Sequence, residues 1–143
     1  MKAWKESQEE VRRVKPDKEM AKSILKMIET RMKALELKDR KEFASLVVED
    51  YYEIVKEAIT ALMAIDGYKT LSHEVLIGYL KEFFPQLSES EITLADQFRQ
   101  LRNKITYKGF FVTPDFLERN EEKINIVTLK LLNILKQKLS THK

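Results

Sequence analysis

The sequence predicts an all-α protein, built as a single-domain bundle of four to five helices. Three observations support this prediction. Only three glycines and three prolines occur in 143 residues, which leaves room for long helices. Apolar residues recur every three or four positions over most of the chain, which is the spacing of one helix face. No segment of useful length shows the alternating pattern of a strand.

The composition is typical of a folded domain. The hydrophobic fraction is 43%, and the chain is long enough for one core but short for two. Cysteine is absent, which excludes disulfides and thiol nucleophiles. No apolar run approaches the roughly 20 residues that span a bilayer, and the charged start lacks a signal-peptide core, so we expect a cytoplasmic protein. The net charge of +3 is too balanced to predict nucleic-acid binding by itself.

The domain organisation follows from the hydrophobic pattern. Residues 1–15 are polar and are expected to form an arm or a short helix. Residues 16–139 are expected to form the bundle, and residues 140–143 a frayed tail. The first helix of the bundle carries a stripe at helical spacing, made of Met20, Ile24, Met27, Ile28, Met32 and Leu35. The second helix, over about residues 41–65, has a stripe so broad that we expect burial against several neighbours.

The boundaries of the later helices are marked by capping residues. Gly67 is suited to a left-handed cap that ends the second helix. The third helix is expected over residues 72–84. Ser88 and Glu91 have the spacing of a capping box and begin the fourth helix, whose stripe is Leu94, Phe98, Leu101 and Ile105. The fifth helix is expected to begin at Thr113 as N-cap, followed by Pro114.

The most informative segment is the end of the fourth helix, residues 101–110. Arg102, Asn103 and Tyr107 lie at the side of the apolar stripe, and Asn103 and Tyr107 are four residues apart, so their side chains can meet. With Asp96, these residues would place a guanidinium, an amide, a phenol and a carboxylate near one helix end, which is a plausible pocket. Arg99 and Thr106 lie on the side of Arg102, and Asp96 lies on the side of Asn103 and Tyr107. These three residues and Lys108 are further binding candidates.

This segment resembles the motif of HEPN domains, in which an arginine and a polar residue near the end of the fourth helix precede a histidine. Residues 50–58 are similar to the tyrosine-rich second helix of that family, and residues 66–76 to its glycine turn and following helix. The resemblance covers roughly residues 17–139. It implies a HEPN-like bundle and a homodimer. It also implies a partner of the minimal nucleotidyltransferase type, often in a toxin–antitoxin pair, and in many members a metal-independent ribonuclease.

On that resemblance, Arg102 matches the catalytic arginine of the family and Asn103 the polar residue after it. The position of the family's histidine is occupied by Tyr107, and that of a frequent tyrosine two residues later by Gly109. Imidazole, with a pKa of about 6.5, accepts a proton near neutral pH, whereas a phenol near 10 is a poor base. The substitution therefore favours a site that binds RNA or a nucleotide over one that cleaves.

Two other functions stay open, and neither calls for a metal or a cofactor. The chain could be an active metal-independent endoribonuclease toxin in which Tyr107 or another group replaces the histidine. It could also be a non-enzymatic dimeric adaptor without a nucleic-acid role.

Several residues also have purely structural interpretations. Arg102 could cap carbonyls at the helix end, and Tyr107 could anchor the loop. His73 leads an apolar stripe, which favours a packed or capping histidine. The loop Phe110-Phe111-Val112 is unusually apolar, and we expect it to be buried in the core or in a dimer interface.

Overall fold

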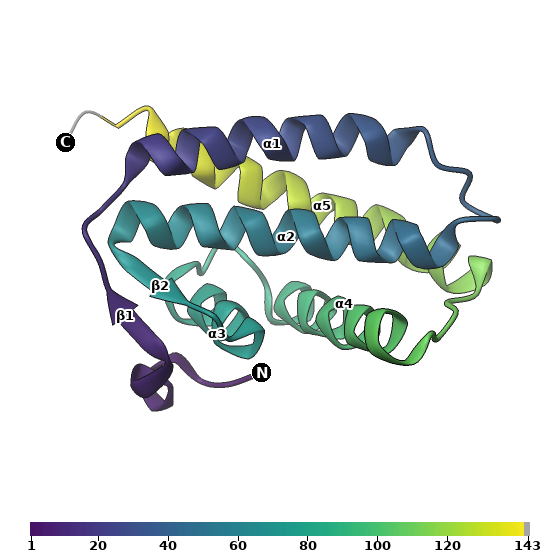
Figure 1. The fold of residues 1–143 in the computed structure, drawn as a ribbon, viewed down its shortest axis with the longest axis horizontal. Helices are drawn as coiled ribbons and strands as arrows, with labels where there is room; N and C mark the ends of the chain where they lie inside the picture. Colours follow the sequence, from purple (N-terminus) through teal and green to yellow (C-terminus); the bar gives the residue numbers. More distant parts are fainter. Residues whose placement is uncertain (142–143) are drawn as a thin grey trace.

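The computed structural model describes residues 1–141 and shows a helical bundle, so the helical part of the fold prediction is confirmed (Figure 1). These residues form five α-helices and two short strands. His142, together with Lys143, lies outside the described residues. The helices are α1 (Lys18–Glu36), α2 (Ala44–Asp66), α3 (His73–Phe83), α4 (Glu89–Lys108) and α5 (Pro114–Leu139), and the strands are β1 (Val11–Arg13) and β2 (Tyr68–Thr70).

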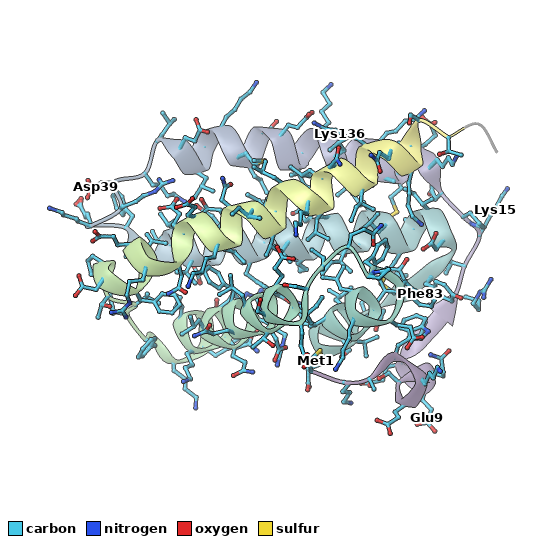
Figure 2. All side chains as sticks on the ribbon, turned by 180° about the vertical axis from the view of Figure 1, so that it is seen from behind. Met1, Glu9, Lys15, Asp39, Phe83 and Lys136 are labelled. Atoms are coloured by element: carbon cyan, nitrogen blue, oxygen red, sulfur yellow. The ribbon has the colours of Figure 1, made fainter. Side chains whose placement is uncertain are left out.

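Helix α2 is the centre of the bundle. It contacts each of the other four helices, with α1 and α5 along one side and α3 and α4 along the other (Figure 1). Its buried side chains point to several sides of the helix, as its broad apolar stripe predicted. Charged side chains such as Lys15, Asp39 and Lys136 project outward from the periphery (Figure 2). The largest fully buried side chains include Tyr52, Tyr79, Phe98, Ile59 and Leu62.

The predicted capping signals are confirmed. The side chain of Ser88 accepts a hydrogen bond from the backbone of Glu91, whose carboxylate accepts one from the backbone of Ser88. Thr113 accepts from the backbone of Phe116 in the same way at the start of α5. Gly67 ends α2 in the left-handed conformation, with φ of 83°. These local interactions satisfy backbone groups that a helix leaves unpaired at its ends, so they could be recognised from sequence.

Two expectations about the first half of the bundle were wrong. Met20 and Met27 belong to the predicted stripe of α1, yet both are exposed, because α1 packs on α2 through the narrower line of Ala21, Ile28 and Leu35. Helix α2 begins at residue 44, three residues later than predicted. Residues 40–43 form a separate turn before the helix, in which the carboxylate of Asp39 accepts hydrogen bonds from the backbone N–H groups of Lys41 and Glu42.

The N-terminal segment departs most from expectation. The arm or short helix predicted for residues 1–15 is two short 3₁₀ helices followed by β1, which pairs antiparallel with β2. This correction also applies to the expected absence of strands. Trp4 is buried and meets the rings of Tyr68, Tyr79 and Phe83 edge-on. The segment is therefore packed against α3 and belongs to the folded unit.

Gly78 explains how the N-terminal segment approaches α3 so closely. A Cβ atom at this position would lie 1.9 Å from the carbonyl oxygen of Lys2, a separation that no real contact allows. The backbone of Lys2 also donates a hydrogen bond to the carbonyl of Glu74 at 3.4 Å. Because Gly78 has no side chain, the backbone of the N-terminal segment can lie directly against α3 at this residue.

None of the helices over residues 1–141 has the length and apolar character needed to cross a membrane.

Candidate functional site

Arg102 lies half-buried on α4, on the side that faces α2. Its guanidinium carbon is 6.0 Å from the ring centre of Tyr52 and 5.9 Å from that of Tyr107. One guanidinium nitrogen donates to the side-chain oxygen of Asn103 at 3.3 Å. Within residues 1–141, no carboxylate forms an ion pair with Arg102. The predicted neighbours are thus brought together, and the cation keeps donor capacity for a ligand.

Asp96 and Arg99 were predicted as binding residues, and the structure places both of them in the protein interior, bonded to one another. The guanidinium of Arg99 donates to Asp96 at 2.8 Å, and Gln100 donates to the second carboxylate oxygen at 3.0 Å. Burial is the largest single effect and opposes the charged carboxylate. The hydrogen bond and charge of Arg99, the charge of the N-terminus and the hydrogen bond from Gln100 together outweigh it and lower the pKa of Asp96. Asp96 and Arg99 therefore form an ion pair with one another, whereas Arg102 has no carboxylate partner among residues 1–141.

The remaining predicted residues lie towards the end of α4. Thr106 donates to the carboxylate of Glu49 at 2.7 Å and thereby links α4 to α2. Tyr107 is 72% exposed, so it does not anchor the loop against the core. Lys108 is exposed in the last turn. Asn103 bonds to Arg102, and no hydrogen bond joins it to Tyr107 in the described part of the chain.

The structure adds one residue that the sequence did not assign to the site. His73, the first residue of α3, hydrogen-bonds through Nδ1 to the hydroxyl of Tyr52 at 2.8 Å. The two rings are nearly parallel, with an angle of 26° and centres 5.6 Å apart. Burial, followed by the positive charge of Arg102, lowers the pKa of His73. An imidazole and an unpaired guanidinium therefore flank the same tyrosine.

His73 escaped detection because its neighbours come from other elements. It precedes Arg102 by 29 positions, and only the packing of α3 and α4 beneath α2 brings the two together (Figure 1). Its stripe on α3 predicted a packed or capping role, and the hydrogen bond to Tyr52 does include a packing component. The two adjacent tyrosines of α2 gave a weak indication of such a contact, because a buried phenol usually has a hydrogen-bond partner.

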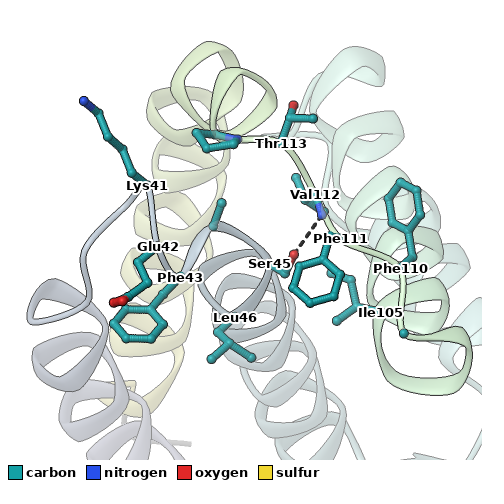
Figure 3. A pocket seen from close by; sticks show the side chains of 13 residues that line it. Lys41, Glu42, Phe43, Ser45, Leu46, Ile105, Phe110, Phe111, Val112 and Thr113 are labelled. Carbon is teal, nitrogen blue, oxygen red and sulfur yellow. Dashed lines mark hydrogen bonds between the residues drawn. The ribbon is translucent and has the colours of Figure 1, made fainter.

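A second feature lies at the end of the bundle, where α4 turns into α5. A cavity of about 640 Å³ opens there between the start of α2 and the loop after α4 (Figure 3). Its lining includes Phe43, Leu46, Phe110 and Phe111, and a hydrogen bond from the backbone of Val112 to Ser45 fixes the loop at 2.7 Å. Val112 is buried as expected. Phe110 and Phe111 are exposed, so the expectation of a loop buried in its own core was wrong for them.

No family model, curated protein or solved structure matches the chain.

The arrangement around Tyr52 has a defined chemical capacity. Arg102 is suited to bidentate hydrogen bonding of a phosphate, and the exposed ring of Tyr107 offers a surface on which a nucleobase could stack. Within residues 1–141, no three metal-ligating side chains gather in one place. What the site presents is a cation, an imidazole and aromatic rings.

Proposed function

We propose that this chain is a HEPN-like protein that binds RNA or a nucleotide through Arg102. The observation that carries the proposal is the guanidinium of Arg102, which forms no ion pair with a carboxylate of residues 1–141. It lies beside the rings of Tyr52 and Tyr107 and donates to the amide of Asn103. A cation without an internal carboxylate, next to an exposed ring, matches the two contacts that a nucleotide needs, one to phosphate and one to base.

The cellular role that we propose follows from the resemblance at residues 101–110. The chain would act in the cytoplasm as a toxin–antitoxin-type or nucleotidyltransferase-associated component. A nucleotidyltransferase encoded beside it would then co-purify with the tagged chain when both are expressed together. Co-expression without association would remove this part of the proposal and leave the binding site untouched.

RNA binding is tested by fluorescence anisotropy with a labelled single-stranded RNA oligonucleotide at low salt. Replacing Arg102 by alanine should weaken binding about ten- to hundredfold, because a charge-assisted hydrogen bond contributes about 1.5–3 kcal/mol. The matched control is Arg119→Ala, which removes the same charge from an exposed position on α5. Equal losses in the two variants would indicate a general charge effect and would contradict a site at Arg102.

The apolar loop after α4 favours a contact of a different kind, between two copies of the chain. Phe111 is 83% exposed beside the cavity that contains Phe43 and Leu46, so a protruding ring and an apolar groove occur on one surface. Such a surface is complementary to itself about a two-fold axis, which is the geometry of an isologous dimer. We propose a homodimer through this surface. An adaptor that dimerises in this way but binds no RNA is the alternative function.

A further inference from the structure

Another cavity lies at the other end of α2, away from the apolar loop. It has a volume of about 410 Å³ and is bounded by the chain after β1, the start of α1, the end of α2, β2 and α3 (Figure 1). Its volume falls in the range of about 300–1,000 Å³ that is typical of small-molecule sites. Among the described residues that line it, none belongs to α4, so a ligand here is independent of RNA binding at Arg102.

The walls of this cavity are largely apolar. Met63, Ala64 and Leu76 are at most 6% exposed, so they close the cavity on the side of the core. Met20 and Leu71 also line it, and they are 45% and 90% exposed. Methionine side chains adapt to irregular apolar partners. An apolar chain in this cavity would therefore remove exposed hydrophobic surface from water, which favours binding.

Most polar side chains of the lining are already engaged within the protein. The carboxylate of Asp17 accepts a hydrogen bond from the first turn of α1, and the hydroxyls of Thr60 and Thr70 donate to backbone carbonyls. Lys15 and Lys69 are exposed, and neither side chain has a hydrogen-bond or ion-pair partner among residues 1–141. Their amino groups are carried on flexible four-carbon stems and can reach a head group at the mouth of the cavity.

We propose that this cavity binds a small amphipathic anion, whose apolar chain lies against Met20 and Met63 and whose carboxylate is bound by Lys15 and Lys69. Asp17 is the one acidic residue of the described lining, and the dipole of α1 offsets its charge at the N-terminus of that helix. A cationic head group would instead meet the like charges of two lysines. The charge of the lining and its apolar walls therefore fit one class of ligand.

The methyl signals of methionine report where such a ligand binds. The chain has five methionines, and two of them, Met20 and Met63, line the cavity. In protein with isotope-labelled methionine methyl groups, decanoate below its micelle concentration should shift both NMR signals until they saturate. Met27 is the internal control, because it is 51% exposed on the same helix but lies outside the lining. Shifts of Met27 without those of Met20 and Met63, or no saturable shift, would refute the site.

Calorimetry with variants tests the apolar wall. Met20→Gln should weaken decanoate binding about three- to tenfold, because roughly half of this side chain would become covered by the ligand. Met27→Gln is the matched control and should bind decanoate as the wild type does. Octanoate, which is two methylenes shorter, should bind the wild type about 15-fold more weakly. Equal affinities of Met20→Gln and the wild type would place the ligand elsewhere, for example beside Phe111, and would contradict the proposal.

The head group is tested with decyltrimethylammonium, which has a chain of the same length and the opposite charge. It should bind the wild type more weakly than decanoate, and the difference should shrink in the double variant K15Q/K69Q. Each neutralised lysine should weaken decanoate binding about two- to fivefold, which is the range of an exposed ion pair. Lys33→Gln is the control, since Lys33 is exposed on α1 about 20 Å along the helix from Met20. Equal binding of the two amphiphiles to the wild type would refute the anionic ligand.

Discussion

Tyr52 shows how a single buried side chain organises the candidate site. Its ring is part of the core and its hydroxyl holds His73, while Arg102 lies beside the same ring. The sequence predicted Arg102 and Asn103 as neighbours because they are adjacent on one helix. It could not predict the roles of Tyr52 and His73, because the contacts of Tyr52 with His73 and with Arg102 join three different helices.

At the residue scale, the lowered pKa of His73 has a consequence for stability that does not depend on activity. The folded protein binds a proton at His73 less readily than the unfolded chain, so it loses stability as pH falls below about 6.5. The melting temperature of the wild type should therefore drop more between pH 7.5 and 5.5 than that of H73N. The carboxylates are common to both proteins and cancel in this comparison. Parallel decreases would show that His73 titrates normally.

At the scale of elements, the bundle helices and the N-terminal segment differ in what specifies them. Helix α4 is specified locally, since its capping box and apolar stripe lie within its own sequence. Strand β1 has only three residues, and its partner β2 lies more than 50 positions away. The sequence of so short a strand cannot be distinguished from that of a loop, because the hydrogen bonds that define the strand are made with a distant segment.

Gly78→Ala tests whether the close contact of the N-terminal segment with α3 contributes to stability. Alanine normally stabilises a helix over glycine by about 1 kcal/mol, whereas overpacking against the backbone of Lys2 costs about 1–3 kcal/mol. We expect the clash to dominate, with a net loss in the free energy of unfolding. Trp4 is the only tryptophan, so its fluorescence should show that the segment has become more exposed to solvent.

The matched control for this experiment is Gly109→Ala. Gly109 also has special backbone geometry, with φ of 65°, but no atom lies within 4 Å of a Cβ built there. The substitution should cost about 1–2 kcal/mol through strain in the left-handed conformation, and the fluorescence of Trp4 in the folded state should stay unchanged. A stabilised Gly78→Ala variant with native fluorescence would show that the close contact between Gly78 and the backbone of Lys2 does not limit the packing of the segment.

At the scale of the whole molecule, the bundle leaves one apolar surface uncovered where α4 meets α5. The sequence indicated that the loop was apolar enough to be buried. The fold buries only Val112 from it, and the two phenylalanines remain on the surface beside the cavity. Exposed aromatic residues grouped around a groove are typical of protein contact surfaces.

Phe111→Ser tests the proposed dimer by sedimentation velocity over a range of concentrations. Loss of a central aromatic side chain typically costs about 2 kcal/mol or more at an interface, so the dimer should dissociate at concentrations about 30-fold higher than for the wild type. Leu71→Ser is the matched control, because Leu71 is equally exposed but lies beside β2. A wild type that sediments as a monomer at all concentrations, or equal effects of both variants, would count against the proposed surface.

Local sequence patterns predicted the helical architecture and the caps of α4 and α5, whereas the predicted contact between Asn103 and Tyr107 is replaced by a hydrogen bond from Arg102 to Asn103. The helices and caps depend on residues within a few positions of one another, so the spacing of apolar and capping residues in the sequence predicts them. Packing between helices determines that Arg99 is paired with Asp96 while Arg102 has no carboxylate partner in residues 1–141. It also determines that His73 lies next to Tyr52 and that Phe110 and Phe111 are exposed. Those properties depend on packing between α2, α3 and α4, where contacts join residues far apart in the chain. Arg99 and Arg102 lie three positions apart on the same helix. Arg99 forms an internal ion pair because Asp96 is buried beside it, whereas Arg102 has no such neighbour and is the candidate ligand site.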